Sequence, residues 1–101
     1  MAGLIFYKQQ ITIPPKTTRT LSAKRGLIYL YTDINHGNAI ISIHGQSVPR
    51  ISEIHNGTQG AIVFDGNGGF LNVTNTSRDT LQIFNNSDVT SCNLYVLSII
   101  Y

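Results

Sequence analysis

Apolar and polar residues alternate along most of the chain, and turn residues interrupt the alternation every eight to twelve positions. A period of two predicts β-strands that bury one face and expose the other. We expect eight or nine short strands, at residues 4–13, 18–23, 27–33, 39–44, 48–54, 60–64, 70–74, 79–84 and 92–101. No segment has helical periodicity, so the chain is predicted to be all-β.

Turn residues set the predicted strand ends. Pro14 and Pro15 end the first strand because proline cannot donate a hydrogen bond to a strand ladder. Asn56-Gly57 is a strong turn signal. Residues 60–74 are predicted to form a hairpin, with the glycine-rich sequence at 65–69 as its tip.

This many antiparallel strands in 101 residues predict a single domain, residues 1–101, built as a two-sheet sandwich of the jelly-roll kind. An immunoglobulin-like sandwich is the nearest alternative. The chain has no tryptophan and one cysteine, Cys92, so it lacks the Cys-Trp-Cys core of immunoglobulin domains.

Two of the expected strands are apolar on both faces. In residues 27–33 the faces are Ile28 and Leu30, and Leu27, Tyr29 and Tyr31; in residues 94–101 they are Leu94, Val96 and Ile100, and Tyr95, Leu97, Ile99 and Tyr101. A solvated antiparallel strand should be apolar on one face only, so a loop, the N-terminal strand or another subunit must cover the second face. We predict an oligomer interface made of Leu27, Tyr29, Tyr31, Tyr95, Leu97, Ile99 and Tyr101. Which of the two faces points inward is left open.

Charged residues make up only 12% of the chain, and the net charge is +2. The usual charged share is about 25%. Asn, Thr, Ser, Gln and Gly take their place, and a surface of neutral amides and hydroxyls suits contact with polyols or with copies of the same chain. The first residues lack the pattern of a signal peptide, and no apolar run is long enough to cross a bilayer, so we expect no membrane insertion.

The residues that could carry chemistry form no recognised catalytic or metal-binding pattern. Cys92 opens a predicted strand and is expected to be a small buried apolar residue. The spacing of His36, His44 and His55 does not match that of structural zinc ligands. We therefore expect no enzyme activity and no cofactor or metal. The basic residues between 16 and 25 are too sparse for a nucleic-acid partner.

Asparagine-rich turns offer a second kind of candidate site. Amide groups hydrogen-bond to sugar hydroxyls, and nearby aromatic rings can stack on sugar faces. The candidate ligand-binding residues are Asn35, His36, Asn38, Asn67, Asn85 and Asn86. Plain turn chemistry is the alternative explanation for all six.

The strand pattern of residues 11–21 and 26–31, together with that of residues 80–87 and 94–99, resembles small all-β virion proteins of bacteriophages. These are tail, fibre, baseplate or head-decoration modules. The resemblance implies a non-enzymatic assembly or host-recognition role, a homo-oligomer with a trimer favoured, and other virion proteins as partners. It also implies a protein made in the host cytoplasm and located in the virion. It carries no functional residues over. The alternative is a stand-alone, lectin-like carbohydrate-binding domain.

Overall fold

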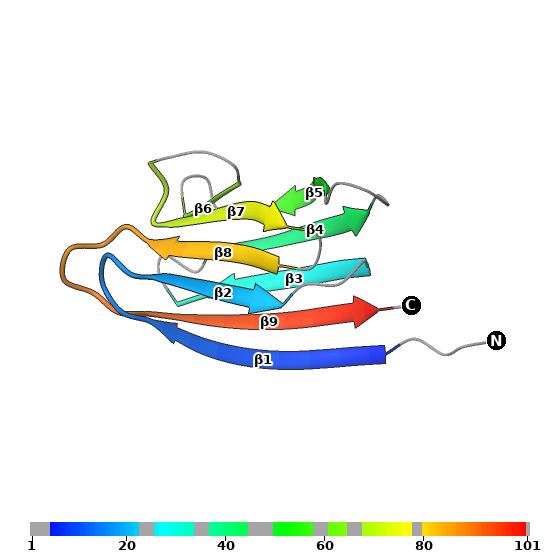
Figure 1. Cartoon of the computed structure of the whole chain (residues 1–101), viewed down its shortest axis with the longest axis horizontal. Coiled ribbons are helices and arrows are strands. Elements are labelled where there is room, and N and C mark those ends of the chain that lie inside the picture. The colour runs from blue at the N-terminus through cyan, green and yellow to red at the C-terminus, as the bar shows by residue number, and fades with distance from the viewer. Residues whose placement is uncertain are drawn as a thin grey trace.

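Nine β-strands make up most of the chain that the structure describes (Figure 1). This computed structural model describes residues 5–22, 26–33, 37–44, 50–57, 61–64, 68–77 and 80–100. The strands are β1 (Ile5–Ile13), β2 (Thr18–Ser22), β3 (Gly26–Thr32), β4 (Asn38–His44), β5 (Arg50–Asn56), β6 (Ile62–Phe64), β7 (Leu71–Ser77), β8 (Thr80–Asn85) and β9 (Cys92–Ile100). The described residues contain no helix, and hence none long and apolar enough to cross a membrane.

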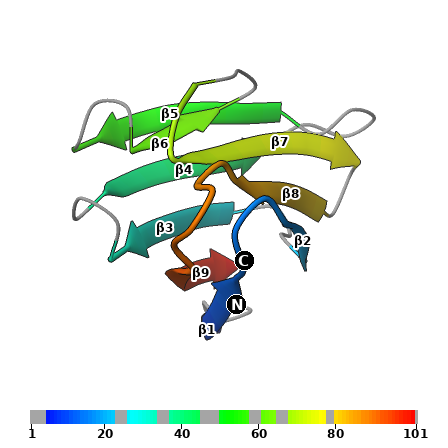
Figure 2. The ribbon, with the colours of Figure 1, turned by 90° about the vertical axis from the view of Figure 1, so that its left-hand side faces the viewer.

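The strands form two sheets, which confirms the predicted sandwich. The five-stranded sheet has the order β1-β9-β3-β4-β5, and the four-stranded sheet has the order β2-β8-β7-β6. Figure 2 shows β1 at the lower end of the five-stranded sheet, below β9. All pairs within the five-stranded sheet are antiparallel.

The chain crosses between the sheets in a jelly-roll manner near its two ends. β1, β2 and β3 alternate between the sheets. β8 then returns beside β2, and β9 returns between β1 and β3. The middle of the chain differs from a jelly roll because β4 and β5 both stay in the five-stranded sheet. The fold is therefore a jelly-roll-like, mostly antiparallel sandwich.

Alternate residues of most strands fill the space between the sheets. Buried aliphatic side chains from both sheets form one cluster: Ile13, Leu21, Ile28, Leu30, Ala39, Ile41, Ile43, Ile62, Leu71, Val73, Leu81, Ile83, Leu94 and Val96, with Cys92 among them. β-branched and leucine side chains suit this pleated, half-buried geometry. Burial of this cluster is what holds the two sheets face to face.

The hairpin predicted for residues 60–74 is wrong. β6 and β7 lie side by side but run parallel, with Ile62 opposite Leu71 and Phe64 opposite Val73. β6 has only three residues and is about 10 Å long, so a connection of six residues can return to its starting end. The backbone N–H of Leu71 donates to the carbonyl of Ala61 at 2.8 Å and fixes this return.

Candidate functional site

Six apolar side chains form a continuous stripe on the outer face of the five-stranded sheet. Direct pairs across β3 and β9 are Leu27 with Ile99, Tyr29 with Leu97, and Tyr31 with Tyr95. We call these six residues the outer stripe. Six of the seven residues predicted for an oligomer interface thus share one surface, and Tyr101 lies outside the described residues.

The structure also shows which face of these strands points inward. Ile28 and Leu30 of β3, and Leu94 and Val96 of β9, are buried against the four-stranded sheet. The tyrosines lie on the opposite face, where their hydroxyl groups can reach water. A buried tyrosine hydroxyl needs a hydrogen-bond partner, so the aliphatic face is the one that buries at lower cost.

Much of the outer stripe is in contact with solvent. Leu27, Tyr29 and Tyr95 are 40%, 39% and 41% exposed. The rings of Tyr31 and Tyr95 lie 6.0 Å apart between centroids and are tilted by 44°. The N-terminal strand does not cover this face, because β1 is hydrogen-bonded to the edge of β9 in the same sheet.

The outer face of the four-stranded sheet is polar by comparison. The row of paired residues Thr20, Gln82 and Thr74 crosses β2, β8 and β7, and all three side chains are exposed. Phe84, two residues from Gln82 on the same face, is half-buried and lies beside the Lys16 ammonium. Among the described strand residues, the exposed large apolar side chains of the two outer faces, Phe6, Leu27, Tyr29 and Tyr95, all belong to the five-stranded sheet. Exposed apolar surface of this sort is found at protein interfaces.

A groove of about 460 Å³ runs along this face between β1 and β3. Tyr29, Tyr95 and Leu97 line it together with Lys8 and Gln10 of β1. The groove therefore has an apolar floor and a polar flank. A fully buried apolar centre with a polar rim is the usual anatomy of a protein interface.

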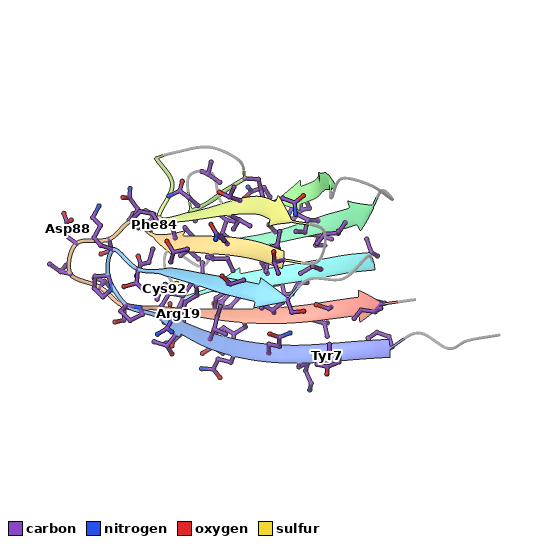
Figure 3. All side chains as sticks on the ribbon, viewed as in Figure 1. Tyr7, Arg19, Phe84, Asp88 and Cys92 are labelled. Atoms are coloured by element: carbon purple, nitrogen blue, oxygen red, sulfur yellow. The ribbon has the colours of Figure 1, made fainter. Side chains whose placement is uncertain are left out.

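Three of the asparagines predicted to bind a ligand, Asn38, Asn85 and Asn86, lie at one end of the sandwich. Asn38 begins β4 and Asn85 ends β8, and both positions lie at the end where β1 turns into β2. Figure 3 labels Phe84, Asp88 and Cys92 at this loop end. Asn86 follows Asn85 in the loop before β9, while Asn35, His36 and Asn67 lie outside the described residues.

Asn85 has a structural role and is not available to a ligand, contrary to the prediction. It is fully buried, and its Nδ2 donates to the carbonyl oxygens of Ile13 at 2.9 Å and Thr90 at 2.8 Å. Its Oδ1 accepts from the backbone N–H of Ser87 at 3.0 Å. Both donors are occupied, so Asn85 ties the end of β1 to the β8–β9 loop.

Asn86 is more accessible and borders a shallow hollow. Its Oδ1 accepts a hydrogen bond from Lys16 Nζ at 2.8 Å, and the same ammonium lies 3.5 Å from Asp88 Oδ1 and 5.9 Å from the centre of the Phe84 ring. The hollow has a volume of about 220 Å³. Its lining consists of Gly68, Gly69, Phe70, Asn86, Ser87 and Asp88.

Asn38 sits at the border of the outer stripe, opposite Tyr31, and its carbonyl accepts from the Gly57 N–H at 2.8 Å. Asn38 is on the five-stranded sheet. Phe70 comes just before β7 and Asn86 just after β8, and both of these strands belong to the other sheet. The structure therefore does not gather Asn38 and Asn86 into one described site.

One polar cluster at the loop end was not anticipated from the sequence. Asn93 donates to Asp33 through its backbone N–H at 3.1 Å and through Nδ2 at 3.0 Å, and Thr12 Oγ1 donates to Asn93 Oδ1 at 2.9 Å. Asn93 is 60 positions from Asp33 and 81 positions from Thr12, so no local sequence pattern predicts this cluster. They brace the start of β9 between β1 and β3.

Cys92 has the surroundings of a structural cysteine. It is buried in the core, and its Sγ lies 2.8 Å from Thr32 Oγ1 and 3.6 Å from the carbonyl oxygen of Asn93. Burial raises the pKa of the Cys92 thiol above its ordinary value; the Thr32 hydrogen bond opposes this rise, and the charge of Asp33 adds to it. A raised pKa leaves little of the thiolate that nucleophilic chemistry requires.

Among the described residues, no three His, Cys, Asp or Glu side chains gather closely enough to hold a metal ion. Comparison with known proteins finds no protein family, curated protein or solved structure that matches this chain. The functional argument therefore rests on the geometry of the outer stripe and of the loop end.

Proposed function

We propose that this protein is a non-enzymatic structural module that self-associates through the outer stripe. The observation that carries the proposal is the contrast between the two outer faces. One is a row of exposed threonine and glutamine side chains, and the other presents paired Tyr, Leu and Ile side chains to solvent. Covering the stripe with a second copy removes this apolar surface from water.

Polar and apolar residues both border the stripe. Lys8 and Gln10 flank it on β1, and Ser42 and Asn38 flank it on β4. Phe6 on β1, opposite Ile99, and Ile40 on β4, opposite Tyr29, continue the apolar surface beyond the stripe. A contact on this face would therefore combine apolar area with polar groups at its margin. The resemblance to phage virion proteins suggests a particle as the setting, with a trimer favoured and a contribution to host-surface recognition.

The test compares the mass in solution of the wild type with that of two variants, Leu97→Asp and Ile99→Asp. Both positions face outward, so we expect both variants to stay folded and to lose association, because each would bury an unpaired charge in the contact. Gln82→Asp, on the polar face, is the matched control and should keep the wild-type mass. Light scattering over a dilution series provides the mass, and circular dichroism checks the fold.

A wild type that stays monomeric at every concentration would overturn the proposal. Folded Leu97→Asp and Ile99→Asp variants with unchanged mass would move the contact away from the outer stripe.

A second candidate function is carbohydrate binding at the loop end. The hollow beside Asn86 offers the half-exposed ring of Phe70, an amide, a hydroxyl and a carboxylate within one small concavity. This is the combination that stacks on a sugar ring and bonds its hydroxyls. Titration against a glycan panel tests it: binding should be lost in Phe70→Ala and Asn86→Ala, and absence of binding at millimolar sugar would exclude it.

A further inference from the structure

β1 is an edge strand of the sandwich, and its long free edge is less protected than those of the other three edge strands. Within the described chain β1 pairs with β9 alone, so the backbone groups along its other side lack a strand partner. An open strand edge is a template for another strand unless the protein protects it. Protection takes the form of shortness, bulges, charge or proline.

The other edges carry such protection. β2 has five residues and β6 three. β5 contains Arg50 and Glu53, and its pairing with β4 is interrupted by a register shift. β1 has nine residues in unbroken register with β9, no internal proline and one charged residue, Lys8.

Both faces of β1 expose an aromatic ring. Phe6, on the outer face, is 63% exposed, and Tyr7, on the inner face, is 55% exposed. Tyr7 points to the side of the sheet that faces the core, and yet the four-stranded sheet leaves it open. A hollow of about 220 Å³ lies here, lined by Tyr7, Gln9, Ser22, Ser98 and Ile100. Figure 3 shows Tyr7 on β1 at the lower border of the molecule.

We propose that β1 pairs antiparallel with β1 of a second copy about a two-fold axis at Gln9, which joins the two five-stranded sheets into one. The pairing rests on the proposed self-association but uses a different surface. A two-fold axis normal to the sheet keeps the outer faces on one side. Paired residues must then both be odd-numbered or both be even-numbered, so that their side chains lie on the same face of the joined sheet. A one-residue slip would turn each side chain to the other face.

The register follows from length and charge. Gln9 is the midpoint of Ile5–Ile13, so an axis there pairs all nine residues of each strand. It sets Tyr7 against Ile11 of the second copy and Phe6 against Thr12 of the second copy. An axis at Lys8 would set two like charges directly opposite each other, which is destabilising. At the Gln9 axis each Lys8 faces Gln10 of the second copy.

Cysteine cross-linking tests this register. In Gln9→Cys the two introduced thiols face each other across the axis, within the Cα separation that a disulfide spans, about 4.4–6.8 Å. In Lys8→Cys they are diagonal neighbours at about 7–8 Å. We expect a disulfide-linked dimer from Gln9→Cys under mild oxidation and none from Lys8→Cys, Gln82→Cys or the wild type, whose Cys92 is buried.

Mass measurements separate this contact from the outer stripe. The edge contact doubles the assembly that the outer stripe forms, so that a trimer becomes a hexamer. We therefore expect an even number of chains in the wild-type assembly and half that number in Gln9→Lys, whose dissociation constant for the edge contact should rise about 100-fold or more. Lys8→Gln should tighten the contact roughly 1.5- to 5-fold at low salt because it removes a diagonal like-charge pair. Arg19→Gln, on β2, should change nothing.

A wild type with an odd number of chains overturns the edge pairing and leaves the outer stripe intact as an interface. So does an even-numbered assembly in which Gln9→Cys stays unlinked. A dimer linked through Lys8→Cys in place of Gln9→Cys also overturns it, since the axis would then lie one residue away. A monomeric wild type overturns both proposals.

Discussion

At the scale of single residues, buried asparagine side chains hydrogen-bond to the backbone of nearby loops and, in one case, of a distant strand. Asn85 links the end of β1 to the β8–β9 loop, and Asn72 exchanges hydrogen bonds with the backbone of Gly69. Asparagine suits these positions because its amide both donates and accepts. Asparagine-rich turns therefore serve the fold at several positions, as turn chemistry alone would suggest.

Replacing Asn85 tests this structural role. We expect Asn85→Ala to lower the free energy of unfolding by roughly 2–4 kcal/mol, because it leaves the carbonyl groups of Ile13 and Thr90 without their donor. Asn86→Ala, one residue further along the same loop, should cost no more than about 0.5 kcal/mol. Urea unfolding measures both, and equal losses in the two variants would contradict the assignment.

Cys92 gives the protein a predictable response to alkaline pH. Since burial raises the pKa of this thiol, the unfolded chain loses the proton first, at its ordinary pKa of about 8.5. The contribution of Cys92 to stability is therefore complete below that pH and declines as the pH rises through it. The difference in unfolding free energy between the wild type and Cys92→Ala should narrow between pH 7 and pH 10, and a difference that widens would contradict the direction of the pKa shift.

At the scale of elements, the sequence predicts the strands and their antiparallel pairing, with the exception of the pair β6 and β7. Strand positions follow from alternation, and each expected strand is found within a few residues of its predicted bounds. The parallel pairing of β6 and β7 escapes prediction because a glycine-rich turn signals that the chain reverses, not where it returns. The sequence predicts which residues form the outer stripe, because every second residue of a strand lies on the same face. It does not predict which face points inward, because both faces of β3 and β9 are apolar.

Gly26, at the start of β3, shows how closely β3 approaches β9. Its φ of +147° favours glycine, and a Cβ there would collide with the carbonyl oxygen of Ile99. Gly68 also has a positive φ, +97°, but open space around it. We expect Gly68→Ala to cost about 1–3 kcal/mol from backbone conformation alone, and Gly26→Ala to cost more. Thermal unfolding of both variants gives the order, and a reversed order would contradict the close approach.

At the scale of the whole molecule, the sandwich presents three different surfaces. The outer face of the four-stranded sheet is polar, the outer face of the five-stranded sheet carries the outer stripe, and β1 leaves one long edge open. A face contact and a two-fold edge contact in the same chain are sufficient to build a closed dihedral assembly or an extended layer. The low charge of the chain favours the proposed contacts, but which surfaces would make them depends on strand order, which the sequence does not reveal.

The pairing of Ile5 with Ile100 has a mechanical consequence. Hydrogen bonds of an antiparallel pair lie perpendicular to the strands. Tension applied between residues 5 and 100 therefore pulls along these hydrogen bonds. The β1–β9 ladder opens one hydrogen bond at a time, because the force does not load all the bonds together. Under such a pull β1 detaches first, at low force, and the edge proposed to pair with a second copy is lost before the core unfolds.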